Sequence, residues 1–316
     1  MRATVVFNRR ISAGYRHMGI ASPGFPADPQ AGRFVMVRPP QVGDPFLPRA
    51  FSLYRLSQTA DATTPVIEIL YKIVGKGTHY LSTLESGQEL ELLGPLGNSF
   101  TPPPPGGTAV LVAGGIGVPP IAALARALAP RGGSGARCQV SGAESPSTVH
   151  GPRSAVDTPS SMVVFLGGKT AEDILCLDDF QGLGVTPHIT TEDGSLGARG
   201  LITDLLGPFL ASPLCPVPCA LYTCGPPGML AAVARLAEER GVPCQASVEA
   251  NMACGFGACM GCAIEMRSEG PSRQYKLVCK DGPVFDAREI RWGWEGESRE
   301  SRVESRAERG CGCHEP

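Results

Sequence analysis

Residues 111–120 read Leu-Val-Ala-Gly-Gly-Ile-Gly-Val-Pro-Pro, a short apolar strand that runs through a glycine turn into a helix with prolines in its first turn. Such a turn lets a pyrophosphate approach the backbone N–H groups at a helix N-terminus. Glycine turns also follow strands in doubly wound sheets that bind no nucleotide, so the stretch alone leaves that question open. It does predict a strand, a turn and a helix in that order.

Strand and helix patterns alternate around this turn, from residue 106 to residue 248. Apolar strands are expected at 108–113, 162–168 and 219–225, and helices at 119–129 and 226–241. This alternation predicts a doubly wound parallel sheet. Residues 131–161 are rich in Gly, Ser, Pro and Ala, which predicts a flexible surface insertion between two units of the sheet.

The first 101 residues follow a different pattern. Short alternating or β-branched runs are separated by turn signals, at 3–7, 33–37, 49–55, 65–74 and 88–95. This spacing is typical of a small antiparallel β-barrel. The run Thr101-Pro-Pro-Pro-Pro-Gly-Gly can continue neither a strand nor a helix, so it predicts a linker between the first two domains.

A third unit, expected at 249–290, contains Cys254-x4-Cys259-x2-Cys262 followed by Cys279. This is the spacing of plant-type 2Fe-2S ligands with a shorter final gap, and the interspersed glycines suit a loop whose N–H groups point at sulfur. A structural zinc site is the alternative, although zinc motifs usually pair two C-x2-C units. The unit is too small for a conventional core, so it needs a metal centre or docking for stability.

Composition sets limits on the function. The chain has 316 residues, a net charge of −2 and 42% hydrophobic residues, so charge gives no bias toward nucleic acid or membrane. No apolar run approaches the roughly 20 residues that span a bilayer, and the start reads as a strand, so we expect a cytoplasmic location. Twelve cysteines without a signal peptide indicate thiols or metal ligands, not a disulfide framework. Residues 294–316 are expected to form a disordered tail.

Three further groups are candidate cofactor contacts. Arg49-Ala50-Phe51-Ser52 offers a cation, an aromatic ring and a hydroxyl on one strand, and Leu70-Tyr71-Lys72 and Gly75-Lys76-Gly77-Thr78 follow it. Cys224-Gly225-Pro226-Pro227-Gly228-Met229 places another strand end against a helix start, at the sheet edge where ligands bind. Taken singly, each group is more often plain core or surface.

Taken together and in this order, these motifs resemble the ferredoxin-NADP reductase superfamily with a C-terminal cluster domain. More narrowly, the chain resembles the electron-transfer subunits of bacterial dihydroorotate dehydrogenase B. The stretches most particular to that family are 247–263 and 278–285. Ala113 stands where the family has the first of three glycines, the insertion at 131–161 is a tolerated loop or a sequence irregularity, and the family indicates no role for the tail cysteines Cys311 and Cys313.

The resemblance implies cofactors and contacts. FAD would lie in the barrel, with Arg49 on its pyrophosphate, Phe51 beside the flavin and Ser52 near the reactive nitrogen; the rest of the site would be Ala50, Leu70, Tyr71, Lys72, Gly77 and Thr78. NAD(H) would lie against Gly114, Gly115, Gly117, Cys224, Gly225 and Pro226, and the 2Fe-2S ligands would be Cys254, Cys259, Cys262 and Cys279. No catalytic acid or base is expected, because the cofactors carry the chemistry.

The resemblance also implies a partner and a reaction. Electrons would pass between NADH, FAD, the cluster and the FMN of a catalytic subunit that oxidises dihydroorotate to orotate in pyrimidine biosynthesis, in a heterotetramer with two copies of each chain. Two alternatives stay open. One keeps the cofactors but changes the partner, as in reductase subunits of sulfide dehydrogenase, ferredoxin-NADP oxidoreductase or hydrogenase complexes. The other is a zinc-stabilised interaction module with a degenerate nucleotide fold.

Overall fold

The computed structural model describes residues 1–12, 14–27, 29–38, 46–129, 161–213, 215–268, 270 and 272–293. The predicted insertion at 131–161, apart from Ser161, and the predicted tail at 294–316 lie outside these ranges. Within the described ranges, no helix combines the length and the apolar character needed to cross a membrane.

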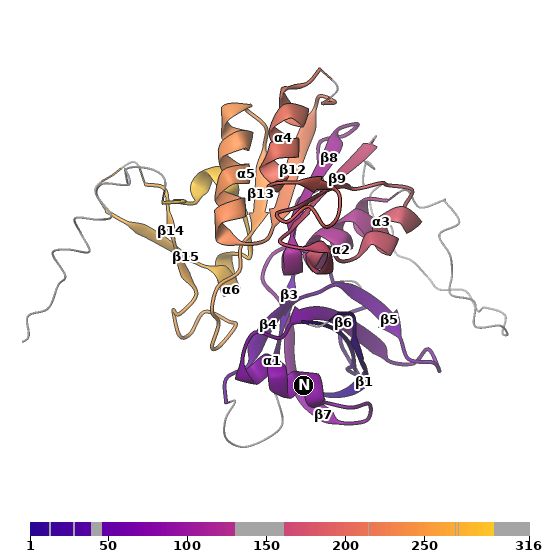
Figure 1. Cartoon of the computed structure of the whole chain (residues 1–316). Helices are drawn as coiled ribbons and strands as arrows, with labels where there is room; N and C mark the ends of the chain where they lie inside the picture. Colours follow the sequence, from indigo (N-terminus) through magenta and orange to yellow (C-terminus); the bar gives the residue numbers. More distant parts are fainter. Residues whose placement is uncertain are drawn as a thin grey trace, which may run out of the picture.

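The first unit is a seven-stranded antiparallel sheet with the order β4-β3-β7-β1-β2-β6-β5, and it curls into a barrel (Figure 1). Its elements are β1 (Arg2–Arg10), β2 (Tyr15–Ala21), β3 (Phe34–Arg38), β4 (Arg49–Ser52), β5 (Arg55–Gln58), β6 (Pro65–Lys72), α1 (Lys76–Thr83) and β7 (Glu89–Leu96). Alternate side chains such as Val5, Ile20 and Ile69 fill its interior. The predicted barrel is confirmed.

The second unit is a seven-stranded sheet with the order β11-β10-β9-β8-β12-β13-β16, parallel except at β16. Its elements are β8 (Thr108–Gly114), η1 (Gly115–Gly117), α2 (Val118–Leu128), β9 (Ser161–Gly168), η2 (Ala171–Asp173), α3 (Leu177–Gly182), β10 (His188–Thr191), β11 (Ala198–Arg199), α4 (Ile202–Ala211), β12 (Cys219–Cys224), α5 (Pro227–Glu239) and β13 (Cys244–Ser247). The chain runs outward from β8 to β10, then returns to β12 beside β8. The strand order therefore reverses between β8 and β12, where ligands of such sheets bind.

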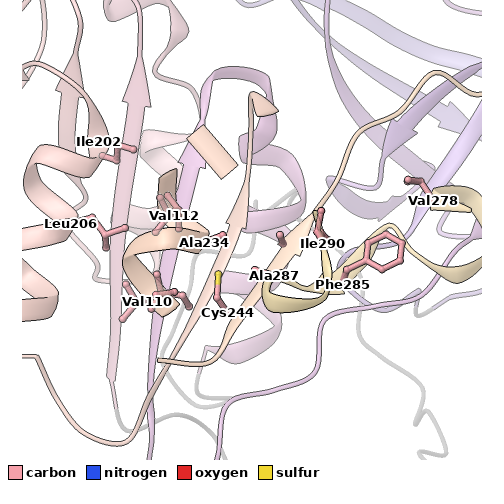
Figure 2. Packing of buried hydrophobic residues seen from close by; sticks show 14 of the residues in the cluster. Val110, Val112, Ile202, Leu206, Ala234, Cys244, Val278, Phe285, Ala287 and Ile290 are labelled. Atoms are coloured by element: carbon pink, nitrogen blue, oxygen red, sulfur yellow. The ribbon is translucent and has the colours of Figure 1, made fainter. Parts of the chain in front are cut away.

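Alternating side chains of β8 divide the core between the two faces of this sheet. Val110 and Val112 pack with residues of α4 and α5, such as Leu206 and Ala234 (Figure 2), whereas Leu111 packs with residues of α2. Both faces are covered, which explains why β8 reads as an unbroken apolar run.

The third unit contains β14 (Ala263–Met266), β15 (Gln274–Leu277), α6 (Val278–Asp281), β16 (Val284–Asp286) and η3 (Ala287–Glu289). Strands β14 and β15 form a hairpin, but β16 pairs with β13 and extends the parallel sheet. Figure 2 shows Val278, Phe285 and Ile290 continuing the core that begins at Val110 and Val112. The unit thus shares its core with the second one, because it is too small to build its own.

Polar contacts fix the barrel on the α/β unit. The carboxylate of Asp179 accepts hydrogen bonds from the Tyr54 hydroxyl and from the guanidinium groups of Arg55 and Arg126. The linker is held at Thr101, whose N–H donates to Oε1 of Gln245 at 2.8 Å and whose carbonyl accepts from Nε2 at 2.9 Å.

Candidate functional site

A cavity of about 730 Å³ lies where the three units meet. The barrel contributes one wall, and it includes every candidate residue that the sequence placed there: Arg49, Ala50, Phe51, Ser52, Leu70, Tyr71, Lys72, Gly77 and Thr78. The glycine turn contributes Ile116 and Pro119, and the chain that leaves β13 contributes residues 247–253 together with Gly261 and Pro283. Residues from β4, β6 and α1 are thus brought together because these elements are neighbours at one rim of the barrel.

Arg49 and Gly77 form the most crowded corner of this cavity. A Cβ atom at Gly77 would lie 2.3 Å from Nε of Arg49, so only glycine allows the guanidinium to lie over the start of α1. The Thr78 hydroxyl is used locally, because it accepts hydrogen bonds from the N–H groups of Val74 and Gly75 and donates to the Gly75 carbonyl. A guanidinium cation beside the N-terminus of a helix is an arrangement that binds a pyrophosphate.

Aromatic side chains line the cavity beside this corner. The rings of Phe51 and Tyr71 lie 5.6 Å apart between centroids, and the Tyr71 hydroxyl donates to Oδ1 of Asn8 at 3.1 Å. Burial raises the pKa of Tyr71 to about 12, so this phenol stays protonated at neutral pH. Lys72 reaches away from the barrel, and its ammonium pairs with Oδ1 of Asp173 at 3.1 Å.

The two predicted turns of the nucleotide site pack against each other at the carboxyl ends of β8 and β12. A Cβ atom at Gly117 would lie 2.4 Å from the carbonyl oxygen of Cys224, and one at Gly114 would lie 2.5 Å from Sδ of Met229. The Cys224 thiol is fully buried, and burial raises its pKa. Its thiol is therefore a packing group in the described structure and not an ionised nucleophile.

Glu249 is the carboxylate of the cavity. The residue is exposed where it lines the cavity, and desolvation raises the pKa of its carboxyl above the ordinary value. Its charge is close enough to raise the pKa of Cys224 further. Sequence reasoning gave no role to Glu249, although it lies in the stretch 247–263 that was most particular to the resembled family.

The four candidate ligands of the third unit form two neighbouring pairs. Sγ of Cys262 and Sγ of Cys279 lie 3.2 Å apart and are buried, and the Cys254 thiol is hydrogen-bonded by the side chain of Cys259. Desolvation opposes ionisation of Cys254, but backbone N–H groups of Cys259 and Phe256 lower the pKa of this thiol to about 6. Within the described ranges, no three His, Cys, Asp or Glu side chains converge as they would on one metal ion.

One further cysteine contact was not predicted. Sγ of Cys215 and Sγ of Cys219 lie 3.8 Å apart, where the loop before β12 meets the start of the strand. They lie at the opposite end of the strand from Cys224, so they take no part in the cavity.

Comparison with known proteins assigns the chain to a family. Residues 249–291 match the iron-sulfur cluster binding domain of dihydroorotate dehydrogenase B. The electron-transfer subunit of dihydroorotate dehydrogenase B (NAD(+)) from Caldanaerobacter subterraneus subsp. tengcongensis is 33% identical, over 92% of this chain and 98% of the relative. That from Bacillus caldolyticus is 35% identical, over 83% of this chain and 86% of the relative. The chain belongs to this family of electron-transfer subunits.

Solved structures agree with the dihydroorotate dehydrogenase B family on the fold. A chain of the NADH-dependent reduced ferredoxin-NADP oxidoreductase superposes with a TM-score of 0.69 at 22% identity, covering 97% of this chain and 98% of that one. A ferredoxin NADP+ reductase from Neisseria gonorrhoeae gives a TM-score of 0.56 at 16% identity, covering 76% and 91%. The resemblance drawn from the sequence motifs is therefore confirmed, as is the fold class.

Proposed function

We propose that the chain is the electron-transfer component of an NAD-dependent dihydroorotate dehydrogenase. It would pass electrons between NAD(H), FAD and a 2Fe-2S cluster, to and from the FMN of a catalytic subunit that converts dihydroorotate to orotate. One observation carries the proposal: a single cavity is lined by the barrel residues, by the glycine turn at Ile116 and Pro119, and by residues that adjoin cysteines Cys254 and Cys262. Three groups that exchange electrons need this proximity.

The barrel wall of the cavity fits FAD. The volume of about 730 Å³ falls in the range of cofactor pockets. The guanidinium of Arg49 occupies the space that a Cβ atom at Gly77 would fill. Arg49 and the start of α1 would hold the pyrophosphate, while Phe51, Ser52 and Tyr71 would border the flavin ring. Bound FAD supplies the exchange between two-electron and one-electron chemistry.

The strand ends of the parallel sheet fit a dinucleotide. Gly114 and Gly117 let the two strand ends pack closely at the start of α2, Gly115 between them is partly exposed, and Gly225 and Pro226 lie at the neighbouring strand end. NADH placed there would extend toward the cavity past Ile116 and Pro119. Glu249 would border the nicotinamide end, where desolvation raises the pKa of its carboxyl and favours the protonated form.

The paired thiols favour a two-iron cluster over a single zinc ion. Zinc would gather four thiolates tetrahedrally around one point, whereas two adjacent pairs can give each of two irons two ligands. The N–H groups that lower the pKa of Cys254 are the donors that stabilise thiolate sulfur. The chemistry of this donor set therefore fits the predicted cluster.

The surface around Cys259 suits a protein partner. Cys259 is exposed, and it lies between Phe256 and Met260, whose side chains are 61% and 60% exposed. Large apolar side chains beside a redox ligand mark a docking surface. We propose that the catalytic subunit covers this surface, in a heterotetramer with two copies of each chain.

The function is tested by reconstitution. The chain co-expressed with an FMN-containing dihydroorotate dehydrogenase subunit should give a complex that reduces NAD when dihydroorotate is supplied. Cys259→Ser should abolish this coupled activity while leaving NADH-dependent dye reduction through the flavin in place. Spectrophotometry of NADH formation measures the first activity, and a flavin-level dye such as ferricyanide measures the second.

Two other results of the reconstitution would each indicate a different function for the chain. A yellow-brown chain that reduces dyes with NADH but never couples to dihydroorotate keeps the cofactors and belongs to another reductase complex. A colourless chain that contains zinc would reject the redox function altogether. Cys244→Ser is the matched control, because Cys244 is buried in β13 away from the cavity and its loss should leave both activities unchanged.

Gly77→Ala should weaken FAD binding. The new methyl group would displace the guanidinium of Arg49, a flexible group that can move without unfolding the barrel. Since a hydrogen bond to a charged group contributes about 1.5–3 kcal/mol, the dissociation constant of FAD should rise by about tenfold or more. Fluorescence titration of the flavin-free protein measures this constant. Gly182→Ala, where a Cβ meets no atom within 4 Å, should bind FAD like the wild type.

A further inference from the structure

The segment Gly282-Pro283-Val284 joins all three units of the chain. It begins three residues after the candidate cluster ligand Cys279, at the end of α6, and it leads into β16 of the parallel sheet. Pro283 lines the cavity, and its carbonyl accepts a hydrogen bond from the N–H of Val248 at 2.9 Å. Any displacement of this segment would therefore move a cluster ligand relative to the cavity.

Asn98, which follows β7 of the barrel, makes three hydrogen bonds to this segment and a fourth to Asp281, the residue before it. Its backbone N–H donates to the Gly282 carbonyl at 2.7 Å, and its Oδ1 accepts from the Val284 N–H at 2.9 Å. Its Nδ2 donates to the carbonyl of Val284 at 2.8 Å and to that of Asp281 at 3.2 Å. The side-chain amide is thus fully used as one acceptor and two donors, a combination that only Asn or Gln provides.

The packing around Asn98 leaves little freedom. A Cβ atom at the preceding residue, Gly97, would lie 2.6 Å from Cδ of Pro283 and 2.7 Å from the Gly282 carbonyl oxygen. On the other side, a Cβ at Gly32 would lie 3.0 Å from Cγ2 of Val284. The barrel backbone therefore approaches the segment as closely as glycines permit, and Asn98 fixes the register of the contact.

We infer that Asn98 is a positioning residue for electron transfer between the flavin and the cluster. The inference rests on the proposed function. The barrel carries the candidate FAD residues and α6 carries Cys279, and the Asn98 amide is the polar contact that ties β7 and its following turn to the segment after α6. Asn98 makes and breaks no bond; it would hold Cys279 and the barrel in the geometry that bound FAD and a bound cluster need for the transfer of one electron at a time.

The test compares Asn98→Ala with Gln245→Ala in the full chain carrying both cofactors. Gln245 also makes two hydrogen bonds between units, to Thr101 of the linker, but it does not contact the segment at Gly282. Stopped-flow absorbance separates flavin reduction by NADH from the later bleaching of the cluster. Asn98→Ala should keep iron and flavin content and the first rate, and should slow the second by about tenfold or more, because small misplacements are costly in such steps.

Hydrogen exchange gives a readout that does not depend on activity. The amide of Val284 should lose protection in Asn98→Ala and keep it in Gln245→Ala, since its acceptor is Oδ1 of Asn98. If the alanine variant does not fold, Asn98→Asp keeps the shape and the acceptor but loses both Nδ2 donors, and it should show the same slow second phase.

Two results would overturn the inference. Asn98→Ala could transfer electrons to the cluster at the wild-type rate although Val284 is unprotected, or both variants could slow the transfer equally, which would indicate a general loss of stability. A wild-type chain whose cluster NADH never reduces would instead overturn the proposed function, and the inference with it. The stopped-flow absorbance record of the wild-type chain alone therefore distinguishes failure of the inference from failure of the proposed function.

Discussion

Gly117→Ala should lose about a hundredfold in the rate of flavin reduction by NADH at a fixed low NADH concentration. The backbone at Gly117 has φ −72° and ψ −2°, values that any residue adopts, so conformational strain is not the cause. The cause is space: the new Cβ would lie 2.4 Å from the carbonyl oxygen of Cys224 and 2.5 Å from the Gly225 nitrogen. Both neighbours are backbone atoms, so the two strand ends must separate.

Separation of these strand ends would disrupt the proposed nucleotide site from both sides. A misplacement of about 1 Å at a binding surface can cost about a hundredfold in rate, which sets the expected size of the effect. Stopped-flow reduction of the bound flavin over a range of NADH concentrations measures it. Gly207→Ala is the control, because its Cβ makes only ordinary contact with Leu236 and alanine favours the helix. Wild-type kinetics in Gly117→Ala would show that NADH binds elsewhere.

The sequence predicted the fold well where local patterns decide it. The apolar strand at 108–114, its glycine turn and the proline-led helix are formed as expected, because their residue types suit those structures independently of distant contacts. No strand is expected from the sequence at Val284–Asp286, within the third unit, yet β16 forms there and pairs with β13 at the edge of the parallel sheet. Three residues carry too weak a pattern to reveal a pairing that depends on long-range packing.

The residues of the candidate site also fall into those that local motifs predict and those that depend on long-range contacts. Residues within recognisable motifs, such as Arg49 and Gly77, could be named from the sequence, and the structure brings them to one cavity. Glu249, Pro283 and Asn98 could not be assigned, because their significance lies in contacts with residues far away in the chain: Asn98 meets a segment 183–186 positions later. The approach of Cys215 to Cys219 depends in the same way on how the loop before β12 folds.

Cys279→Ala should remove the iron and destabilise the protein more than any other single cysteine change among the described residues. Cys279 is 3% exposed, its Sγ lies 3.2 Å from Sγ of Cys262, and its N–H donates to that sulfur at 3.4 Å. Without a bound cluster, burial raises the pKa of this thiol to about 12, so metal coordination is what would keep it ionised. The stability loss should reach about 4 kcal/mol, the size that marks the loss of a metal.

Such a loss corresponds to a drop of about 10 °C in Tm for a chain of this size. Iron analysis, visible absorbance and thermal melting measure the two effects, and Cys244→Ala supplies the control, since Cys244 is 2% exposed in the same hydrophobic core but has no candidate ligand role. That control should keep its iron and lose only about 1 kcal/mol of stability.

The third unit has almost no core of its own, which is why the loss of a cysteine ligand should cost more than the loss of a buried cysteine. Phe285 and Ile290 pack into the parallel-sheet core, whereas the loop from Cys254 to Cys262 is held chiefly by its thiol pairs. If Cys279→Ala kept both its iron and its Tm, that loop would have to be held by its packing against the barrel at Met36 and Leu96, and Cys279 would be no ligand.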